Sequence, residues 1–319
     1  MNTRTVTKIV LDCDPGHDDA VAMILAAGDP RIDLLAVTTV AGNQTLEKVT
    51  RNALAVATVA GIDVPIAAGA DRPLVRPQIV APEIHGESGL DGPVLPEPSV
   101  ALDPRHGVEL IVETVLAHEP GTVTLVPTGP LTNVALAMRL RPEIVDRVAR
   151  VVLMGGAYTR GNKTPAAEFN IAADPEAAAA VFAAPWDVTM VGLDLTHQAT
   201  ADAGVVERIA AIGSPLSAFV VDVLGFFAST YKQQQGFDAP PVHDPCCVAL
   251  IADPAVARVR DAFVAVELTG TWTTGMTVTD FGDAYGQPHN THVATELDHG
   301  RFWDMTVAAI AALSGEGAA

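Results

Sequence analysis

The sequence predicts an α/β fold in which a mainly parallel central sheet is flanked by helices, in the open, doubly wound, Rossmann-like arrangement. Apolar, β-branched runs alternate with helix-like segments along most of the chain, and this order builds a parallel sheet with helices on both faces. The run from Ile32 to Val40 is apolar and β-branched, as expected of a strand covered on both faces. Polar residues recur directly after the strands, at the edge where open α/β sheets bind ligands.

Each expected strand is a short apolar run that is followed closely by Gly, Pro, Asn or Asp. In chain order, the strands are expected at residues 8–11, 32–40, 64–68, 122–127, 148–154, 188–193, 263–268 and 291–296. Helices are expected at residues 19–27, 45–60, 107–118, 131–140, 175–183, 203–212, 215–234, 244–251 and 300–313. Residues 70–106 are rich in Pro and Gly and residues 158–170 are polar, so both are expected to be loops. No linker or internal repeat divides the sequence, which predicts a single domain over residues 1–319.

The composition excludes several classes of partner. Lys and Arg number 19 against 38 Asp and Glu, a net charge of −19, which argues against a nucleic-acid backbone or an anionic membrane as partner. The charge suits a small substrate that is neutral or bound through a metal. Three cysteines (Cys13, Cys246 and Cys247) are too few for a disulfide framework, so a reducing cytoplasm is expected. We expect neither a signal peptide nor a membrane span.

The first strand runs into a cluster of acidic residues. Asp12, Asp14, Asp18 and Asp19 lie within eight residues, interrupted by Pro-Gly. Asp18 and Asp19 fall in the first turn of the next helix, where the helix dipole favours negative charge. Carboxylates this close repel each other unless a cation or a proton lies among them. A solvated acidic turn with one capping Asp would explain one or two of them but not four, and their oxygens suit Ca²⁺ or Mg²⁺ better than Zn²⁺.

We interpret Asp14 and Asp19 as metal ligands, with the backbone carbonyl of Thr128 and the carboxylate of Asp244 completing the protein's share. Asp244 has an alternative interpretation as the N-cap of the helix that it begins. Asp12 lies on the strand and is expected to orient Asp14 without itself contacting the metal ion.

A second polar cluster, Asn162, Glu168 and Asn170, lies among small and apolar residues. Buried amides and carboxylates need partners. A ligand rich in hydroxyl groups would supply them, and so would ordinary hydrogen bonds within the loop.

Two histidines are candidates for chemistry. His243 adjoins Asp244 and is expected to lend a proton near neutral pH, and His85 in its Gly-rich loop is the weaker candidate. The remaining histidines considered are interpreted as solvated surface residues, namely His17, His106, His118, His197 and His299.

Three common active-site motifs are absent from the sequence. No Gly-x-Gly-x-x-Gly follows the first strand, which argues against a dinucleotide site. There is also no Gly-x-x-x-x-Gly-Lys-Ser/Thr loop and no Gly-x-Ser-x-Gly elbow.

Ordered motifs along nearly the whole chain resemble those of the nucleoside hydrolase family, the inosine-uridine preferring type of ribonucleoside N-glycosidase. They are DCDPGHDD at residues 12–19, AGN at 41–43, HGESGL at 85–90, PTGPLTN at 127–133, MGG at 154–156, PAAEFN at 165–170 and VHDP at 242–245.

The resemblance implies Ca²⁺-dependent hydrolysis of ribonucleosides to free base and ribose, on a mainly parallel sheet flanked by helices. It implies that the ion is held by Asp14, Asp19, the Thr128 carbonyl and Asp244, and that Asp14 also acts as the base toward water. The implied ribose contacts are Asp18, Asn43, Asn162, Glu168 and Asn170.

The choice of nucleobase is expected to depend on mobile loops and a helix above the base. The candidate contacts are His85, Phe169, Tyr231 and Gln235, beside His243. A histidine before Asp244 resembles the group that takes inosine and uridine, which favours a broad or pyrimidine-leaning preference. Residues 78–90 and 227–241 are expected to close over the substrate, and a homo-oligomer, either a dimer or a tetramer, is expected.

Three alternatives stay open at this point. A metal-dependent phosphohydrolase also uses Asp-x-Asp after a first strand, but its usual downstream Lys is not evident. A nucleoside-binding or sensor protein would keep the site with little chemistry. A calcium-stabilised structural protein would not need the Asn and Glu cluster.

Overall fold

The computed structural model describes residues 6–315 of the chain. Within these residues a nine-stranded sheet has the strand order β3-β2-β1-β4-β5-β6-β9-β7-β8. Its strands are β1 (Thr7–Cys13), β2 (Ile32–Thr39), β3 (Ile66–Ala68), β4 (Val123–Pro127), β5 (Val148–Met154), β6 (Val188–Val191), β7 (Ala257–Val266), β8 (Thr277–Asp280) and β9 (Thr291–Leu297). In the order of the sheet, every pairing from β3 to β9 is parallel, whereas β7 pairs antiparallel with both β9 and β8. The predicted mainly parallel sheet is therefore confirmed.

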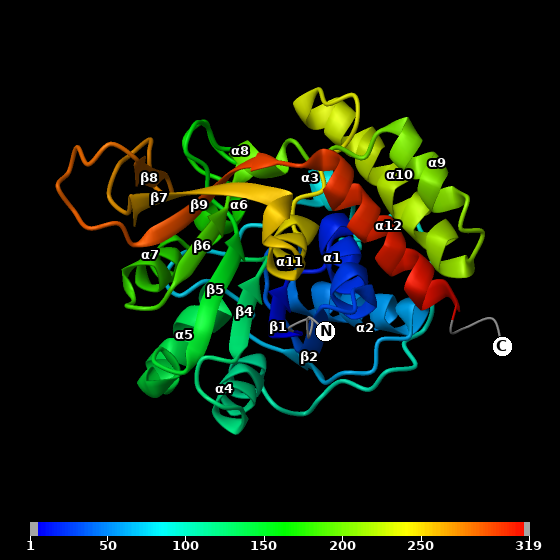
Figure 1. Ribbon diagram of the computed structural model, residues 1–319, viewed down its shortest axis with the longest axis horizontal. Coiled ribbons are helices and arrows are strands. Elements are labelled where there is room, and N and C mark those ends of the chain that lie inside the picture. Colours follow the sequence, from blue (N-terminus) through cyan, green and yellow to red (C-terminus); the bar gives the residue numbers. More distant parts are fainter. Residues whose placement is uncertain (1–5, 316–319) are drawn as a thin grey trace, which may run out of the picture.

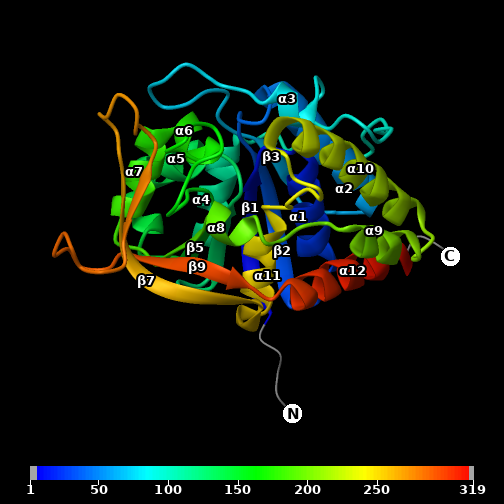
Figure 2. The ribbon, with the colours of Figure 1, turned by 90° about the horizontal axis from the view of Figure 1, so that it is seen from above.

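Helices cover both faces of the sheet (Figures 1 and 2). The longer ones are α1 (His17–Gly28), α2 (Leu46–Ala60), α4 (Gly107–Ala117), α5 (Thr132–Leu140), α7 (Pro175–Ala183), α9 (Ala203–Ala210), α10 (Pro215–Gln235), α11 (Pro245–Ala252) and α12 (His299–Gly315). Helices α4, α5 and α7 lie on one face, and α1, α2, α11 and α12 lie on the other with α9 and α10 outside them. No helix within residues 6–315 combines the length and the apolar character that crossing a bilayer requires.

The buried apolar side chains form two clusters, one on each face of the sheet. Trp303 and Phe302 of α12 are fully buried in the cluster that contains α1, and Phe182 of α7 is buried in the other. All three cysteines are buried and free, as expected of a chain without a disulfide framework.

The strand order reverses at β1, which lies between β2 and β4. Such a switch point opens a crevice at the carboxyl ends of the strands, where α/β proteins bind ligands. The register aligns Cys13 at the end of β1 with Thr39 of β2, and Asp12 with Pro127 of β4. The segments that follow these three strands therefore meet in one place.

Several predicted boundaries are wrong. β7 begins at residue 257, six residues earlier than expected, and the short β8 was not expected. β6 ends at Val191, and the short helix α8 (Leu193–Thr196) follows it. Two other short helices, α3 (Pro82–His85) and α6 (Phe169–Ala173), interrupt segments that were predicted to be loops.

Candidate active site

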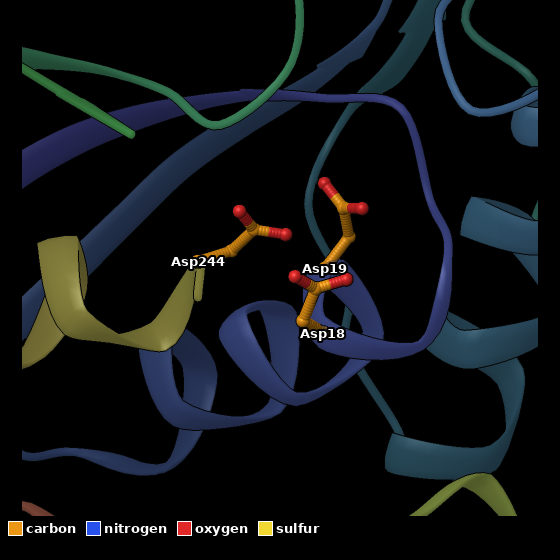
Figure 3. A group of neighbouring side chains, drawn as sticks. All are labelled: Asp18, Asp19 and Asp244. Carbon is orange, nitrogen blue, oxygen red and sulfur yellow. The ribbon is translucent and has the colours of Figure 1, made fainter. Parts of the chain in front are cut away.

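Three carboxylates converge where α1 and α11 begin. One oxygen from each of Asp18, Asp19 and Asp244 lies within 4.8 Å of the other two, and all three residues are buried. Figure 3 shows Asp18 and Asp19 rising from the first turn of α1, while Asp244 reaches toward them from the start of α11. Asp244 occupies the N-cap position, but its side chain makes no capping hydrogen bond. Capping alone therefore does not account for Asp244, and the group is one that can hold a metal ion.

Asp14 lies beside this group but is not part of it. Its Oδ2 accepts a hydrogen bond of 2.6 Å from the backbone N–H of Asn43, and its buried Oδ1 has no partner among the described residues. The Asn43 amide also donates to the backbone carbonyl of Asp14 and to Asp19 Oδ2, at 3.1 and 3.3 Å. Thr128 donates from its hydroxyl to Asp19 Oδ1 at 3.0 Å. Asp14 and Asp19 are thus fixed by the loops that follow β2 and β4.

Asp12 does not contact Asp14 through its side chain. Its Oδ1 accepts hydrogen bonds from Thr38 and Asn133, at 2.6 and 2.7 Å. Any support that it gives to Asp14 therefore passes through the backbone of β1, not through the direct contact that the sequence suggested.

Burial raises the pKa of each carboxyl in this region, and for Asp14, Asp18 and Asp244 neighbouring carboxylates add to the rise. The pKa of Asp18 is raised to about 8 by burial and then by Asp19. Burial, then Asp19, raises the pKa of Asp14, and burial, then Asp18 and Asp19, raises that of Asp244. Without a cation the cluster therefore takes up protons, which is the behaviour expected of a site built for a positive charge.

Gly42 is required beside Asp14, because a Cβ added to it would lie 2.1 Å from Asp14 Oδ2. Gly42→Ala is expected to displace the carboxylate and lower kcat by about 10²-fold, the usual cost of a 1 Å misplacement. The matched control is Gly225→Ala in α10, where an added Cβ meets nothing within 4 Å. Steady-state turnover and melting temperature would be measured for both. Equal activities of the two variants would contradict the proposed constraint on Asp14.

The second polar cluster is held by backbone groups. Glu168 caps α6, and its carboxylate accepts hydrogen bonds of 2.9–3.1 Å from the N–H groups of Gly156, Asn170 and Ile171. Burial raises the pKa of Glu168 to about 7. The Asn170 amide donates to the carbonyl of Thr128 at 2.7 Å, which ties this cluster to the acidic one. The Oδ1 of Asn162 accepts the Phe169 N–H at 2.9 Å, and its Nδ2 makes no hydrogen bond to any residue from 6 to 315.

His243 is buried and hydrogen-bonded through both ring nitrogens. Nδ1 lies 2.7 Å from the Thr196 hydroxyl, and Nε2 lies 2.7 Å from the Tyr231 hydroxyl. Burial, and then His197, lower the pKa of His243 well below its ordinary value. His243 is therefore a neutral imidazole near pH 7, and not the readily charged one that the sequence suggested. Thr196 gives no signal in the sequence that would have marked it as a partner.

The interpretation of His17 as a solvated residue is wrong. Its side chain is 0% exposed, because the rings of Phe226, Phe227 and His85 pack against it. The ring stacks on His85, with the centroids 5.3 Å apart. His197 is half-buried and also lies against aromatic rings.

One pocket joins these parts. Of the residues predicted from the sequence, those that line it are Asp18, Asn43, His85, Thr128, Asn162, Glu168, Phe169, Asn170, Tyr231, Gln235, His243 and Asp244. Asp14 and Asp19 are predicted site residues that do not line it and are buried beside it. The lining residues that sequence reasoning missed include Glu83, Met154, Lys163 and Gln234. Met154 had a signal, since it ends a strand in one of the quoted motifs. Glu83 lies in the short α3, Lys163 in a loop and Gln234 at the end of α10, and no motif marks them.

The fold and the pocket define an α/β protein in which a carboxylate group able to hold a metal ion adjoins a polar pocket for a small molecule. The family model described as "Inosine-uridine preferring nucleoside hydrolase" matches residues 9–304. The chain is 52% identical over 305 residues to the inosine-uridine preferring nucleoside hydrolase of Crithidia fasciculata, covering 95% of this chain and 97% of that protein.

Two further similarities agree. The chain is 47% identical over 299 residues to the pyrimidine-specific ribonucleoside hydrolase RihA of Salmonella typhimurium, covering 93% and 96% of the two chains. The solved structure of a purine-preferring ribonucleoside hydrolase from Gardnerella vaginalis has a TM-score of 0.90 at 30% identity, covering 97% of this chain and 99% of that one. The chain belongs to the inosine-uridine preferring nucleoside hydrolase family, and it is a ribonucleoside hydrolase, an enzyme that acts on N-glycosyl compounds. The resemblance stated from the motifs is confirmed.

Proposed function

We propose that this enzyme uses Ca²⁺ to hydrolyse the bond between ribose C1′ and a nucleobase nitrogen, with a broad or pyrimidine-leaning preference that includes uridine and inosine. The observation that carries the proposal is the single pocket that joins Asp18 and Asp244 to His243 and Tyr231. A ribonucleoside fits this arrangement, because its sugar diol can lie at the carboxylates while its base, which must leave with a proton, lies at His243 and Tyr231.

The acidic group fits a hard cation. Its donors are all oxygens, which suits Ca²⁺ or Mg²⁺ better than Zn²⁺, and the unpartnered Oδ1 of Asp14 is a buried atom in need of a positive partner. The residues proposed to hold the ion are Asp14, Asp19, Thr128 through its carbonyl, and Asp244. When bound, the ion would fix the sugar diol and a water molecule and would offset the negative charge of the carboxylates.

Asp14 is proposed to take the proton of the attacking water. One of its oxygens is anchored by the Asn43 N–H and the other is free of hydrogen bonds to described residues, so the carboxylate is both oriented and available. As the water oxygen bonds to C1′, the C1′–N bond breaks and its electron pair leaves with the base. The fixed carboxylate of Glu168 would stabilise the positive charge that develops on the sugar. The proposed ribose contacts are Asp18, Asn43, Asn162, Glu168 and Asn170.

The departing base is proposed to receive its proton from the hydrogen-bonded pair of His243 and Tyr231. Thr196 holds Nδ1 of the imidazole, which fixes the ring, and the Tyr231 hydroxyl lies at Nε2. Burial raises the pKa of Tyr231, so its hydroxyl keeps its proton until the base accepts one.

His243→Gln is expected to lower kcat/KM for uridine by about 10²-fold or more, the usual contribution of a positioned acid. The same variant should hydrolyse 4-nitrophenyl riboside nearly as well as the wild type, because nitrophenolate leaves without a proton. His197→Gln is the matched control, since the His197 ring lies 5.7 Å from that of His243 but is not among the residues that line the pocket. An equal loss on both substrates in His243→Gln would mean that His243 has another role.

The proposed preference between bases depends on the side chains at the base end of the pocket. The similar proteins are named inosine-uridine preferring, pyrimidine-specific and purine-preferring. The proposed base contacts are His85, Phe169, Tyr231 and Gln235. Values of kcat/KM for uridine, cytidine, inosine and adenosine measure the preference directly, and adenosine as the best substrate would overturn the proposed lean.

The test of the function is base release from uridine, inosine and 4-nitrophenyl riboside, with and without EGTA. We expect release that is lost in EGTA and restored by Ca²⁺. Tight nucleoside binding without release would indicate a sensor, phosphate release from 4-nitrophenyl phosphate would indicate a phosphohydrolase, and a metal effect on stability alone would indicate a structural role.

The proposal extends to closure of residues 78–90 and 227–241 over the bound substrate. α3 lies in the first segment and packs against α10, whose last residues belong to the second. Glu83 of α3 forms an ion pair of 3.5 Å with Lys163, another lining residue of the pocket. A homo-oligomer, a cytoplasmic location and a role in nucleoside salvage complete the proposal.

A further inference from the structure

The buried ring of His17 is part of a cluster of four neighbouring rings next to the pocket. It lies nearly parallel to the rings of Phe226 and Phe227, with centroids 5.1 and 5.2 Å away. The ring of His85 lies next to that of His17, with centroids 5.3 Å apart, and His85 also lines the pocket. Neither the metal site nor the proposed chemistry uses His17, so its hydrogen bonds need a separate explanation.

The hydrogen bonds of His17 determine where its hydrogen lies. Nε2 is 2.8 Å from the backbone carbonyl of Asp91, and a carbonyl oxygen only accepts, so Nε2 carries the hydrogen. A neutral imidazole has one N–H, which leaves Nδ1 of His17 as an acceptor. This Nδ1 lies 3.1 Å from Nδ1 of His85. The hydrogen between the two rings therefore belongs to His85.

The opposite arrangement is disfavoured. The backbone N–H of His17 also lies 3.4 Å from Nδ1 of His85, which would suit a bare nitrogen there. In that case His17 would have to donate from both ring nitrogens and carry a positive charge between two phenylalanine rings. Within residues 6–315 the ion pairs that involve histidine belong to His289 and His292, so such a charge would have no carboxylate within 4.0 Å to pair with.

The second ring nitrogen of His85, Nε2, makes no hydrogen bond to any described residue. It is not one of the fully buried polar atoms that lack a partner, and His85 lines the pocket, so Nε2 is open to a bound molecule. We infer that His17 is a positioning residue that fixes His85 as the Nδ1–H tautomer, so that the bare Nε2 of His85 accepts a hydrogen bond from an O–H or N–H group of the bound nucleoside.

This inference rests on the proposed function and makes its substrate class narrower. With the 2′- and 3′-hydroxyls at the proposed ion, a ribonucleoside such as uridine or inosine offers two further groups of the required kind, the 5′-hydroxyl of the sugar and the ring N–H of the base. Both present a hydrogen to a nitrogen acceptor. An analogue that lacks the relevant hydrogen leaves Nε2 of His85 unpaired and binds less well.

The direct test is ¹⁵N NMR of the full-length protein with ring-labelled histidine near pH 7.5, with signals assigned by His17→Phe and His85→Asn. We expect His85 to show an N–H nitrogen at Nδ1 and a bare nitrogen at Nε2, and His17 to show the reverse. A hydrogen on Nε2 of His85, or two hydrogens on His17, would overturn the inference. Because this measurement needs no substrate, it stays decisive even if the protein released no base.

The kinetic test uses His17→Phe, which keeps an aromatic ring in this cluster but removes the acceptor nitrogen, Nδ1 of His17. We expect KM for uridine to rise about tenfold, the equivalent of one hydrogen bond, with little change in kcat. In the wild type, either 5′-deoxyuridine or 3-methyluridine should already show that rise, and His17→Phe should not weaken that analogue further. This identifies the donor.

His299→Phe is the matched control, because His299 also donates from Nε2 to a backbone carbonyl, that of Thr200, at 2.9 Å, and does not line the pocket. It should leave KM for all three substrates unchanged. An unaltered KM for uridine in His17→Phe, or an equal loss on all three substrates as from a general structural defect, would overturn the inference.

Discussion

Replacing Asp14 with Asn is expected to lower kcat for uridine by about 10³-fold, within the range typical of a lost general base, with a much smaller change in KM. The amide has the same shape but cannot take a proton from water. Oδ1 of Asp14 is the atom that the described residues leave without a partner, whereas Oδ2 is held by the Asn43 N–H. Steady-state base release measures the effect, because a loss in kcat separates the base from a residue that only binds ribose.

The matched control is Asp29→Asn. Asp29 is also a buried carboxylate, but it pairs with Arg31 and does not line the pocket. This variant should melt at a lower temperature and keep its kcat. Near-normal turnover by Asp14→Asn would show that another group activates the water.

Removing the bound cation is expected to abolish measurable base release and to lower the melting temperature. An ion present at about 100 times its Kd stabilises the folded state by about 2.7 kcal/mol, which corresponds to about 5 °C for a chain of this size. The physical reason is that Asp18, Asp19 and Asp244 repel one another when nothing positive lies among them. Calorimetry in EGTA and in CaCl₂ measures the difference. An unchanged melting temperature together with full activity in EGTA would contradict a metal-dependent site.

The stability of the metal-free protein should also depend on pH, in the opposite direction from that of an ordinary salt-bridged carboxylate. Burial raises the pKa of Asp18 from 3.8 to about 8 and that of Asp12 from 3.8 to about 7. At pH values between 3.8 and these raised values, the two carboxyls bind more protons in the folded chain than in the unfolded chain, so their contribution to the free energy of unfolding falls as the pH rises. Buried His17, His85 and His243 have lowered pKa values and act in the opposite direction below about pH 6.5. Melting temperatures in EGTA should therefore be higher at about pH 7 than at about pH 8.5, with a weaker trend in CaCl₂, and equal melting temperatures at the two pH values would contradict this.

The sheet could be predicted where its strands are buried on both faces. The first strands are continuous apolar segments that alternate with helices along the chain, which predicts parallel pairing although their order in the sheet, β3-β2-β1-β4, differs from their order in the chain. The first half of β7 could not be predicted. Arg258, Arg260 and Asp261 are exposed, so this part of the strand lacks the apolar pattern by which a strand is recognised, although it pairs with β9. β8 has only four residues and is recognisable only once its partner strand is in place.

The sequence predicts which residues form the site better than it predicts how their side chains are arranged. The residues after β1, β2 and β4 meet because parallel strands share one edge, and that much follows from the pattern. Which carboxylates come close depends on side-chain direction, and the structure groups Asp18 with Asp19 and Asp244 where the sequence suggested Asp14. His17 is buried because it packs against Phe226 and Phe227 of α10, and nothing in the sequence near His17 indicates that contact.

A crystal structure with Ca²⁺ and ribose, with the ion located by its anomalous scattering, tests the central claim most directly. The account predicts one ion about 2.3–2.6 Å from oxygens of Asp14, Asp19 and Asp244, from the Thr128 carbonyl and from two hydroxyls of the sugar. An ion held without Asp14, or ribose bound with its hydroxyls away from the ion, would contradict it.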